Sequence, residues 1–252
     1  HWLGQLSRGN LGESFYFHAP VAELLWPRLL NTMILALLAM SIAMVVAIGL
    51  GGAAARREGL LAYKFSEFII LLTSATPRIV LALVLLAIAG GTALISAGDS
   101  SATGVVKPLR YAWLPALVLA APLIALFLAQ LRDGLASTLH EEFVQVARSK
   151  GLSERVVLLR HALRATLNPL ITIFGYSLGS VFAGSVIAET VMGWPGLGSL
   201  IVTAVRARDV PLVMGVVLIT STAVMVGNLL ADVLQQLNDP RLRAADSRVA
   251  KQ

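Results

Sequence analysis

The 252-residue chain contains no cysteine, and only 13% of its residues are charged and 6% aromatic. The absence of cysteine excludes disulfides and thiolate metal sites. No His, Asp and Glu residues recur at the spacing of metal ligands. The chain also lacks a Gly-x-x-x-x-Gly-Lys-Ser/Thr loop for nucleotide phosphates. The sequence therefore predicts no metal and no cofactor in this chain, and any ATP must be bound by another one.

Apolar side chains are what the sequence has in abundance, at 57% of its residues. Soluble domains carry about 25% charged residues, so this chain has too few polar groups to cover its apolar surface in water. The net charge of +6 would indicate nucleic acid if the basic residues formed one face, but they lie between apolar runs. We therefore expect a lipid bilayer as its surroundings, and no nucleic acid partner.

Five apolar runs are long enough to cross a bilayer, which takes about 20 helical residues. We expect an all-α polytopic membrane protein with spans at residues 29–52, 68–97, 111–131, 165–188 and 210–231. The second run is broken only at Pro77-Arg78. The fourth is predicted to begin with Asn168 as N-cap and Pro169 in the first helical position.

Basic residues predict the orientation, because cytoplasmic loops retain Lys and Arg. Placing residues 56–64, 132–164 and the C-terminus on one side gives thirteen basic residues there, against six on the other. We therefore expect residues 1–28 to be an external segment with a short interfacial helix near 21–26. Residues 29–237 form the transmembrane domain, with a cytoplasmic loop at 136–164, and residues 238–252 form a cytoplasmic tail. A sixth, N-terminal span is expected to be missing from this chain.

The longest polar interruption is predicted to fold as helix, sharp turn and helix. Phe143, Val146 and Ala147 share one helical face with Val144 beside them, in a segment too short and too charged to span a membrane. Gly151 supplies a left-handed residue that ends this helix, and Ser153-Glu154 begins a second one. The pattern alone is equally compatible with a docking surface for a partner and with a loop resting on its own spans.

Several separated motifs resemble one family of transport proteins. Gln145-Val146-Ala147-Arg148-Ser149-Lys150-Gly151 is followed, after nine residues, by His161-Ala162-Leu163-Arg164. This resembles the "EAA" loop of ABC importer permeases, which reads Glu-Ala-Ala, three residues, Gly, nine residues and Ile-x-Leu-Pro. Ala147, Gly151 and Leu163 match, whereas Gln145 replaces Glu and Arg164 replaces Pro.

Further motifs are similar to the dipeptide/oligopeptide/nickel permeases, in particular to the first (B-type) of their two permease types. They are Pro20-Val21-Ala22-Glu23-Leu24-Leu25, Arg28-Leu29-Leu30-Asn31-Thr32, the segment from Glu189 to Gly198, Arg208-Asp209-Val210-Pro211 and Asp239-Pro240-Arg241-Leu242-Arg243.

The resemblance implies a type I importer permease in the inner membrane, working with an external solute-binding protein, a second permease and two ATP-binding subunits. It implies that those subunits bind ATP and Mg, and that the chain is not itself an enzyme. The transported ligand would be a peptide, or a nickel or opine-like ligand. The residues implied in coupling to the ATPase are Glu142, Gln145, Ala147, Arg148, Lys150 and Gly151.

Two further features have a functional and a purely structural interpretation. Trp194, Pro195, Gly196 and Gly198 predict a tight external turn with the tryptophan at the membrane interface, and the resemblance suggests a lid or a docking surface. Arg78 is the only full charge that we place well inside a span. It either lines the translocation path or extends its charged end to the interface.

Two alternatives from other functional classes remain open at this point. Gly175-Tyr176-Ser177-Leu178-Gly179 fits the Gly-x-Ser-x-Gly pattern of serine hydrolases. The same residues fit a Gly-x-x-x-Gly helix-packing face, extended by Gly184. A stand-alone secondary transporter is the second alternative, and it predicts a repeat symmetry that the sequence does not display.

Overall fold

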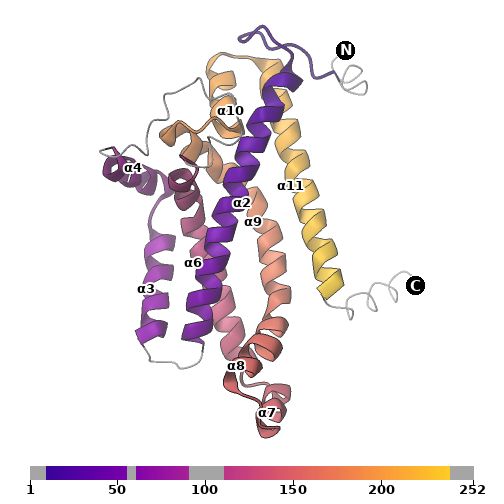
Figure 1. The fold of residues 1–252 in the computed structure, drawn as a ribbon. Helices are drawn as coiled ribbons and strands as arrows, with labels where there is room; N and C mark the ends of the chain where they lie inside the picture. Colours follow the sequence, from indigo (N-terminus) through magenta and orange to yellow (C-terminus); the bar gives the residue numbers. More distant parts are fainter. Residues whose placement is uncertain (1–9, 56–60, 91–110, 239–252) are drawn as a thin grey trace, which may run out of the picture. The chain divides into compact units, whose positions relative to one another are not determined.

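The computed structural model describes residues 10–55, 61–90 and 111–238, and the predicted tail lies outside them. In this part of the chain every regular element is a helix, apart from an isolated bridge between Glu13 and Pro20 (Figure 1). The helices are α2 (Val21–Ala54), α3 (Leu61–Ala75), α4 (Arg78–Ala89), α6 (Trp113–Thr138), α7 (Glu142–Ser149), α8 (Glu154–Val156), the π-helix η2 (Val157–Ala162), α9 (Leu163–Met192), α10 (Leu197–Arg206) and α11 (Val210–Asn238).

Four of these helices, α2, α6, α9 and α11, are long and apolar enough to cross a membrane. The pair α3 and α4 passes the same test as one bent span, interrupted at Thr76-Pro77. Proline has no backbone N–H and clashes with the preceding turn, so a break is expected there. The predicted all-α membrane fold is confirmed among the described residues, with four spans, or five if the pair α3 and α4, bent by 101°, is counted as one span.

The first span begins earlier than the sequence predicts. α2 runs without interruption from Val21 to Ala54 and contains Pro27, so the separate interfacial helix near residues 21–26 is wrong. Val21 and Leu25, which precede the proline, are fully buried. The packing of these two residues inside the protein outweighs the helix break that a proline favours.

The predicted helix start at Asn168-Pro169 is also wrong, although the part of the helix that is long and apolar enough to cross a membrane does begin at Pro169. α9 begins at Leu163, and η2 and α8 precede it directly, so the chain is helical from Glu154 to Met192. Pro169 lies inside this helix. Thr166 and Leu170 on either side are buried, and tertiary packing has thus overridden the local boundary signal.

The described residues divide into two compact units. One comprises the described parts of His1–Met40, Thr76–Ala120 and Leu178–Val226, and the other those of Ser41–Ala75, Ala121–Ser177 and Gly227–Gln252. Each long helix contributes residues to both. A buried apolar cluster stabilises the first unit, and it consists of Val21, Leu25, Phe182, Leu197, Leu200, Ala204, Leu212 and Val216. In the second unit, Phe127 and Phe174 stack with ring centroids 6.1 Å apart.

Candidate functional site

A fully buried carboxylate, Glu189, organises the end of α9 in the first unit. Its Oε1 accepts a hydrogen bond from Thr32 Oγ1 at 2.8 Å, and its Oε2 accepts one from the Ser199 amide at 2.9 Å. Ser199 lies in the first turn of α10, where backbone N–H groups have no partner within the helix. Glu189 therefore caps α10 from another helix, and its negative charge also suits the positive end of the helix dipole.

Two successive residues of α2 hold the turn between α9 and α10. Thr32 Oγ1 accepts the Leu197 amide at 2.8 Å, while Asn31 Nδ2 donates to the Pro195 carbonyl at 2.8 Å. The Asn31 carbonyl accepts the indole N–H of Trp194 at 3.2 Å. Polar contacts thus attach the turn to α2 at three of its residues.

Trp194 is packed inside the protein, and its predicted place at the membrane interface stays a prediction. Its side chain is only 4% exposed, and its backbone N–H donates to the Glu189 carbonyl at 2.9 Å. Gly193 has φ +67°, a conformation that glycine adopts without strain, and it closes the end of α9. The sequence signal was correct for the turn, but the turn is packed against α2 and leads into α10, a helix that the sequence analysis did not predict.

Gly198 permits the closest backbone approach at this turn. A Cβ atom there would lie 2.6 Å from the Val186 Cα, which real Cβ atoms do not tolerate. The predicted external residues Trp194, Pro195, Gly196 and Gly198 are thus brought together with Asn31, Thr32 and Glu189.

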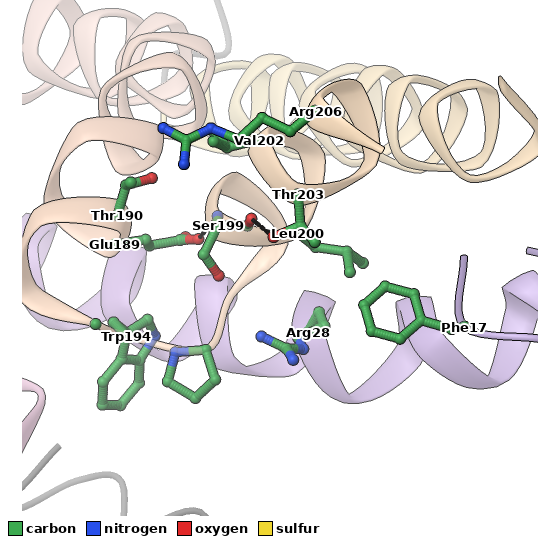
Figure 2. Close-up of a pocket in the computed structure, with 12 residues that line it drawn as sticks. Phe17, Arg28, Glu189, Thr190, Trp194, Ser199, Leu200, Val202, Thr203 and Arg206 are labelled. Atoms are coloured by element: carbon green, nitrogen blue, oxygen red, sulfur yellow. Dashed lines mark hydrogen bonds between the residues drawn. The ribbon is translucent and has the colours of Figure 1, made fainter. Parts of the chain in front are cut away.

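A cavity of about 290 Å³ opens beside the buried carboxylate (Figure 2). Two arginines line it, the half-buried Arg28 of α2 and the exposed Arg206 of α10. Trp194 and Phe17 form part of its apolar wall. The cavity therefore combines positive charge with a partly desolvated surface.

A second buried carboxylate, Asp209, fixes the segment that carries Phe17. It accepts hydrogen bonds from the Ser14 hydroxyl and the Tyr16 amide, and it caps α11 by accepting the Leu212 amide at 3.2 Å. Burial favours a higher pKa for Asp209, but these hydrogen bonds outweigh it and hold the pKa below its usual range. Asp209 is therefore ionised near neutral pH, and its hydrogen bonds hold residues 14–17 against the start of α11.

Arg78 lies apart from this network, at the start of α4. Its Nη2 donates to Ser180 Oγ at 3.0 Å and its Nη1 to the Ser180 carbonyl at 3.4 Å. The guanidinium crosses α9 at Gly184, where a Cβ would overlap it. Arg28 and Glu189 are further charged residues within the helices α2 and α9, each near a helix end. The path-lining role of Arg78 stays a prediction.

In the second unit, α7 ends as the sequence predicts. Gly151 has φ +76°, its N–H donates to the Arg148 carbonyl at 2.9 Å, and the Leu152 N–H points to the Ala147 carbonyl at 3.4 Å. These two bonds form a Schellman motif, which satisfies carbonyls left unpaired at a helix end. Ser153 precedes α8 as predicted, although its side chain makes no capping bond.

The apolar face predicted for α7 is present, and its two edges differ in burial. Val144 and Ala147 are buried, whereas Phe143 and Val146 are 47% and 53% exposed. Successive residues in a helix are rotated by about 100°, so positions 146 and 143 lie along one edge of this face and positions 147 and 144 along the other. The buried edge attaches α7 to its own chain, and the exposed edge is free for contact.

The predicted coupling residues surround this exposed edge. Glu142, Gln145, Arg148, Lys150 and Gly151 are exposed, and Ala147 is buried beneath them. Arg148 joins α7 to α8 through an ion pair with Glu154, with Nε and Oε1 2.9 Å apart. Exposed pairs of this kind contribute little stability, so its main effect is to fix the angle of the turn.

Comparison with known proteins places this architecture in a family. The sequence matches the family described as "Binding-protein-dependent transport system inner membrane component" over residues 47–244. The chain belongs to this family. The permease is 33% identical to the oligopeptide transport system permease protein AppB of Bacillus subtilis (strain 168), over 96% of this chain and 78% of that protein.

Two further comparisons agree with this assignment. The permease is 30% identical to the nickel import system permease protein NikB of Staphylococcus aureus (strain MRSA252), over 96% of this chain and 71% of that protein. A chain from the inward facing MetNI methionine ABC transporter matches with a TM-score of 0.69 and 12% identity, covering 86% of this chain and 97% of that one. The last comparison concerns the fold alone. The chain is thus a multi-pass inner-membrane permease subunit of a binding-protein-dependent ABC importer, and it acts as a transport subunit rather than as an enzyme.

The hydrolase alternative has no structural basis in the permease. Ser177 lies in the middle of α9 and is buried, and its hydroxyl donates to the Ile173 carbonyl at 2.7 Å. A nucleophilic serine of this motif requires a strand-to-helix elbow, whereas this segment is continuous helix. Gly175 instead faces Ala231 of α11 at a distance that leaves no room for a Cβ. The helix-packing interpretation is therefore confirmed for Gly175, whereas Gly184 faces the Arg78 guanidinium.

Sequence reasoning missed Glu189 and Arg28 as site residues. Glu189 is the residue directly after the predicted fourth span, and Arg28 directly precedes the predicted first one. An acidic residue at the end of an apolar run, four positions before a Gly-Trp-Pro-Gly turn, was the available signal. Its partner Thr32 lies 157 positions away in the sequence, and no local pattern connects the two.

Proposed function

We propose that the permease imports peptides and is driven by a separate ATP-hydrolysing subunit that binds α7 from the cytoplasm. In this proposal the importer also contains a second permease, a second ATPase and an external binding protein. ATP and Mg are bound by the ATPases, and the C-terminus is cytoplasmic. The observation that carries the coupling role is the exposed apolar pair Phe143 and Val146 on a helix too short to cross a membrane.

The shape of the α7 segment supports a docking role. A helix of eight residues cannot reach through about 30 Å of hydrocarbon. The buried Val144 and Ala147 fix α7 to the permease, so a force on α7 is passed to the spans. The surrounding charged groups, among them Glu142 and Lys150, provide the polar rim that protein interfaces have around an apolar centre.

The peptide substrate is supported by relatives and not by a pocket in this chain. The protein AppB is named for oligopeptide transport and NikB for nickel import. Peptide is preferred because AppB is the more similar of the two. Uptake of labelled peptides of two to five residues by cells that depend on this importer, compared with uptake of nickel, tests the choice.

Replacing Val146 by Asp tests the coupling role. We expect the variant to reach the membrane at the normal level, to lose co-purification with the ATPase and to lose ATP-dependent uptake. The matched control is Val205→Asp on α10, because Val205 is 59% exposed and thus similar to Val146 at 53%. Retained co-purification with the ATPase in Val146→Asp would refute the docking role.

The orientation can be tested separately. Because the chain has no cysteine, single cysteines at Glu142 and at Arg206 are the only thiols in their variants. A membrane-impermeant thiol reagent added outside intact cells should label position 206 and leave position 142 unmodified until the cells are opened. Labelling of position 142 in intact cells would reverse the proposed orientation.

A further inference from the structure

The cavity beside Glu189 carries more positive than negative charge. Arg28 and Arg206 both line it, and neither makes a hydrogen bond or an ion pair within residues 10–55, 61–90 and 111–238. Figure 2 shows the two side chains reaching the cavity from different helices. Glu189 is the only acidic residue in the lining, so the formal charge of the lining is +2 − 1 = +1.

Glu189 is not free to neutralise both arginines. Its two oxygens accept hydrogen bonds from Thr32 and from the Ser199 amide. Arg28 interacts with the charge of Glu189 without a hydrogen bond to it. The N–H groups of Arg206 make no hydrogen bond to any described residue. A guanidinium offers five N–H groups in a planar fork that matches a carboxylate. An acidic group that entered the cavity would therefore find donors that are already positioned.

The other lining residues favour a carboxylate over a bulkier ligand. Phe17 and Trp194 supply apolar walls, which strengthen charge pairing by excluding water. Ser199 and Thr203 already donate their hydroxyl protons to backbone carbonyls. A volume of about 290 Å³ lies below the usual range of small-molecule sites, about 300–1,000 Å³. A cavity of this size accommodates one side chain or one terminal carboxylate.

The place of the cavity in the chain identifies the side from which a ligand arrives. The cavity lies at the C-terminal end of α9, and α7 and α8 precede the N-terminal end of the same membrane-spanning helix. If α7 faces the cytoplasm, as proposed above, the cavity opens on the external side. There the partner of a binding-protein-dependent importer is the binding protein.

We propose that this cavity is a docking socket for an Asp or Glu side chain of the external binding protein, held by Arg28 and Arg206. The inference rests on the proposed function, because it requires α7 to be cytoplasmic. Phe17 closes one side of the socket, and the hydrogen bonds between Asp209 and residues 14–16 keep Phe17 in place. The socket joins the binding protein to α2, α9 and α10 at once.

The experiment measures binding of the importer's ligand-free binding protein to the whole transporter in lipid nanodiscs. Arg28→Gln and Arg206→Gln are each expected to raise Kd at least tenfold, and the Kd of the wild type should rise more steeply with salt than that of either variant. The matched control is Arg208→Gln, two residues from Arg206 and outside the lining, with a change of less than twofold. Because Arg206 is exposed, its variant is expected to fold normally, and its elution in gel filtration checks this.

A second arm identifies the source of the carboxylate. Surface Asp and Glu residues of the binding protein are changed one at a time to Asn or Gln. One of these binding-protein variants should bind the wild-type transporter weakly, with the same Kd as the wild-type binding protein has for the Arg206→Gln transporter. The same binding-protein change should not raise further the Kd for the Arg206→Gln transporter. Uptake of peptides with free and amidated C-termini is compared in parallel. Normal docking in Arg206→Gln together with a loss of uptake confined to free carboxylates would assign the cavity to the substrate and overturn the proposal.

The outcomes separate this inference from the proposed function. If Arg28→Gln and Arg206→Gln bind like Arg208→Gln while the wild type docks and transports, the socket is refuted and the importer role stands. If the wild-type transporter neither binds the binding protein nor hydrolyses ATP in response to it, the proposed function itself fails.

Discussion

Replacing Thr32 by Val tests the network around Glu189 most directly. The substitution keeps the shape of the side chain and removes a hydroxyl that makes two bonds, one to Glu189 Oε1 and one from the Leu197 amide, both at 2.8 Å. A hydrogen bond to a charged group contributes about 1.5–3 kcal/mol, and leaving a buried N–H unpaired costs about 1–3 kcal/mol. Because one hydroxyl serves both partners and local relaxation recovers part of the loss, we expect a destabilisation of about 2–4 kcal/mol.

The thermal midpoint of the purified permease provides the measurement. A destabilisation of 1 kcal/mol shifts Tm by about 2–4 °C in a chain of 150–250 residues, so Thr32→Val should lower it by about 4–16 °C. Thr32→Ser, which retains the hydroxyl, should recover most of the shift. The control Thr222→Val removes an exposed bond within one helix, from Thr222 Oγ1 to the Leu218 carbonyl, and should change Tm by less than about 2 °C. Equal midpoints for Thr32→Val and Thr222→Val would show that the buried network does not stabilise the turn.

Three further predictions concern other parts of the permease. Gly151→Val should leave the protein in the membrane and uncouple uptake from ATP hydrolysis. The reason is that residue 151 has φ +76°, a left-handed conformation that costs a non-glycine residue about 1–2 kcal/mol. Normal uptake by this variant would contradict the coupling role. Gly198→Ala should lower Tm by several degrees, since its Cβ meets the Val186 backbone at 2.6 Å, and an unchanged Tm would show that the two helices can separate freely. The pKa of Asp209 is lowered in the folded state, so its contribution is fully present above the unfolded-state pKa of about 3.9 and is lost as the pH falls through the lower folded-state value. Tm should therefore be insensitive to this group between pH 5 and 8 and fall in acid, whereas Ser14→Ala should lower Tm already at pH 7.

The spans and the turn after α7 were predictable because their causes are local. A run of about 20 apolar residues has few alternatives to a membrane helix. Gly151 at the end of an amphipathic segment predicts a left-handed turn, since the cost of that conformation depends on the residue's own Cβ. The structure has both features.

Local signals failed where a distant segment determines the outcome. Pro27 and Pro169 each favour a helix boundary, but both lie inside helices whose neighbouring residues are buried. Glu189 was missed for the same reason. Its role depends on Thr32 and on the first turn of α10, and nothing in the sequence around residue 189 identifies those partners. The two exposed residues of α7 were grouped with the two buried ones because periodicity shows which positions are apolar and not which side is covered.

Continuous backbone joins the proposed coupling segment to the buried carboxylate. From Glu154 in α8 to Met192 at the end of α9 the chain is helical without an intervening loop. The 30 residues of α9 alone extend about 45 Å along the helix axis. No loop separates α8 from α9. A movement of α8 must therefore displace α9 or be absorbed in η2, the six-residue π-helix between them, where the hydrogen-bond pattern is wider than in an α-helix. Glu189 links the C-terminal end of α9 to Thr32 of α2 and to the first turn of α10, so these three helices share one carboxylate.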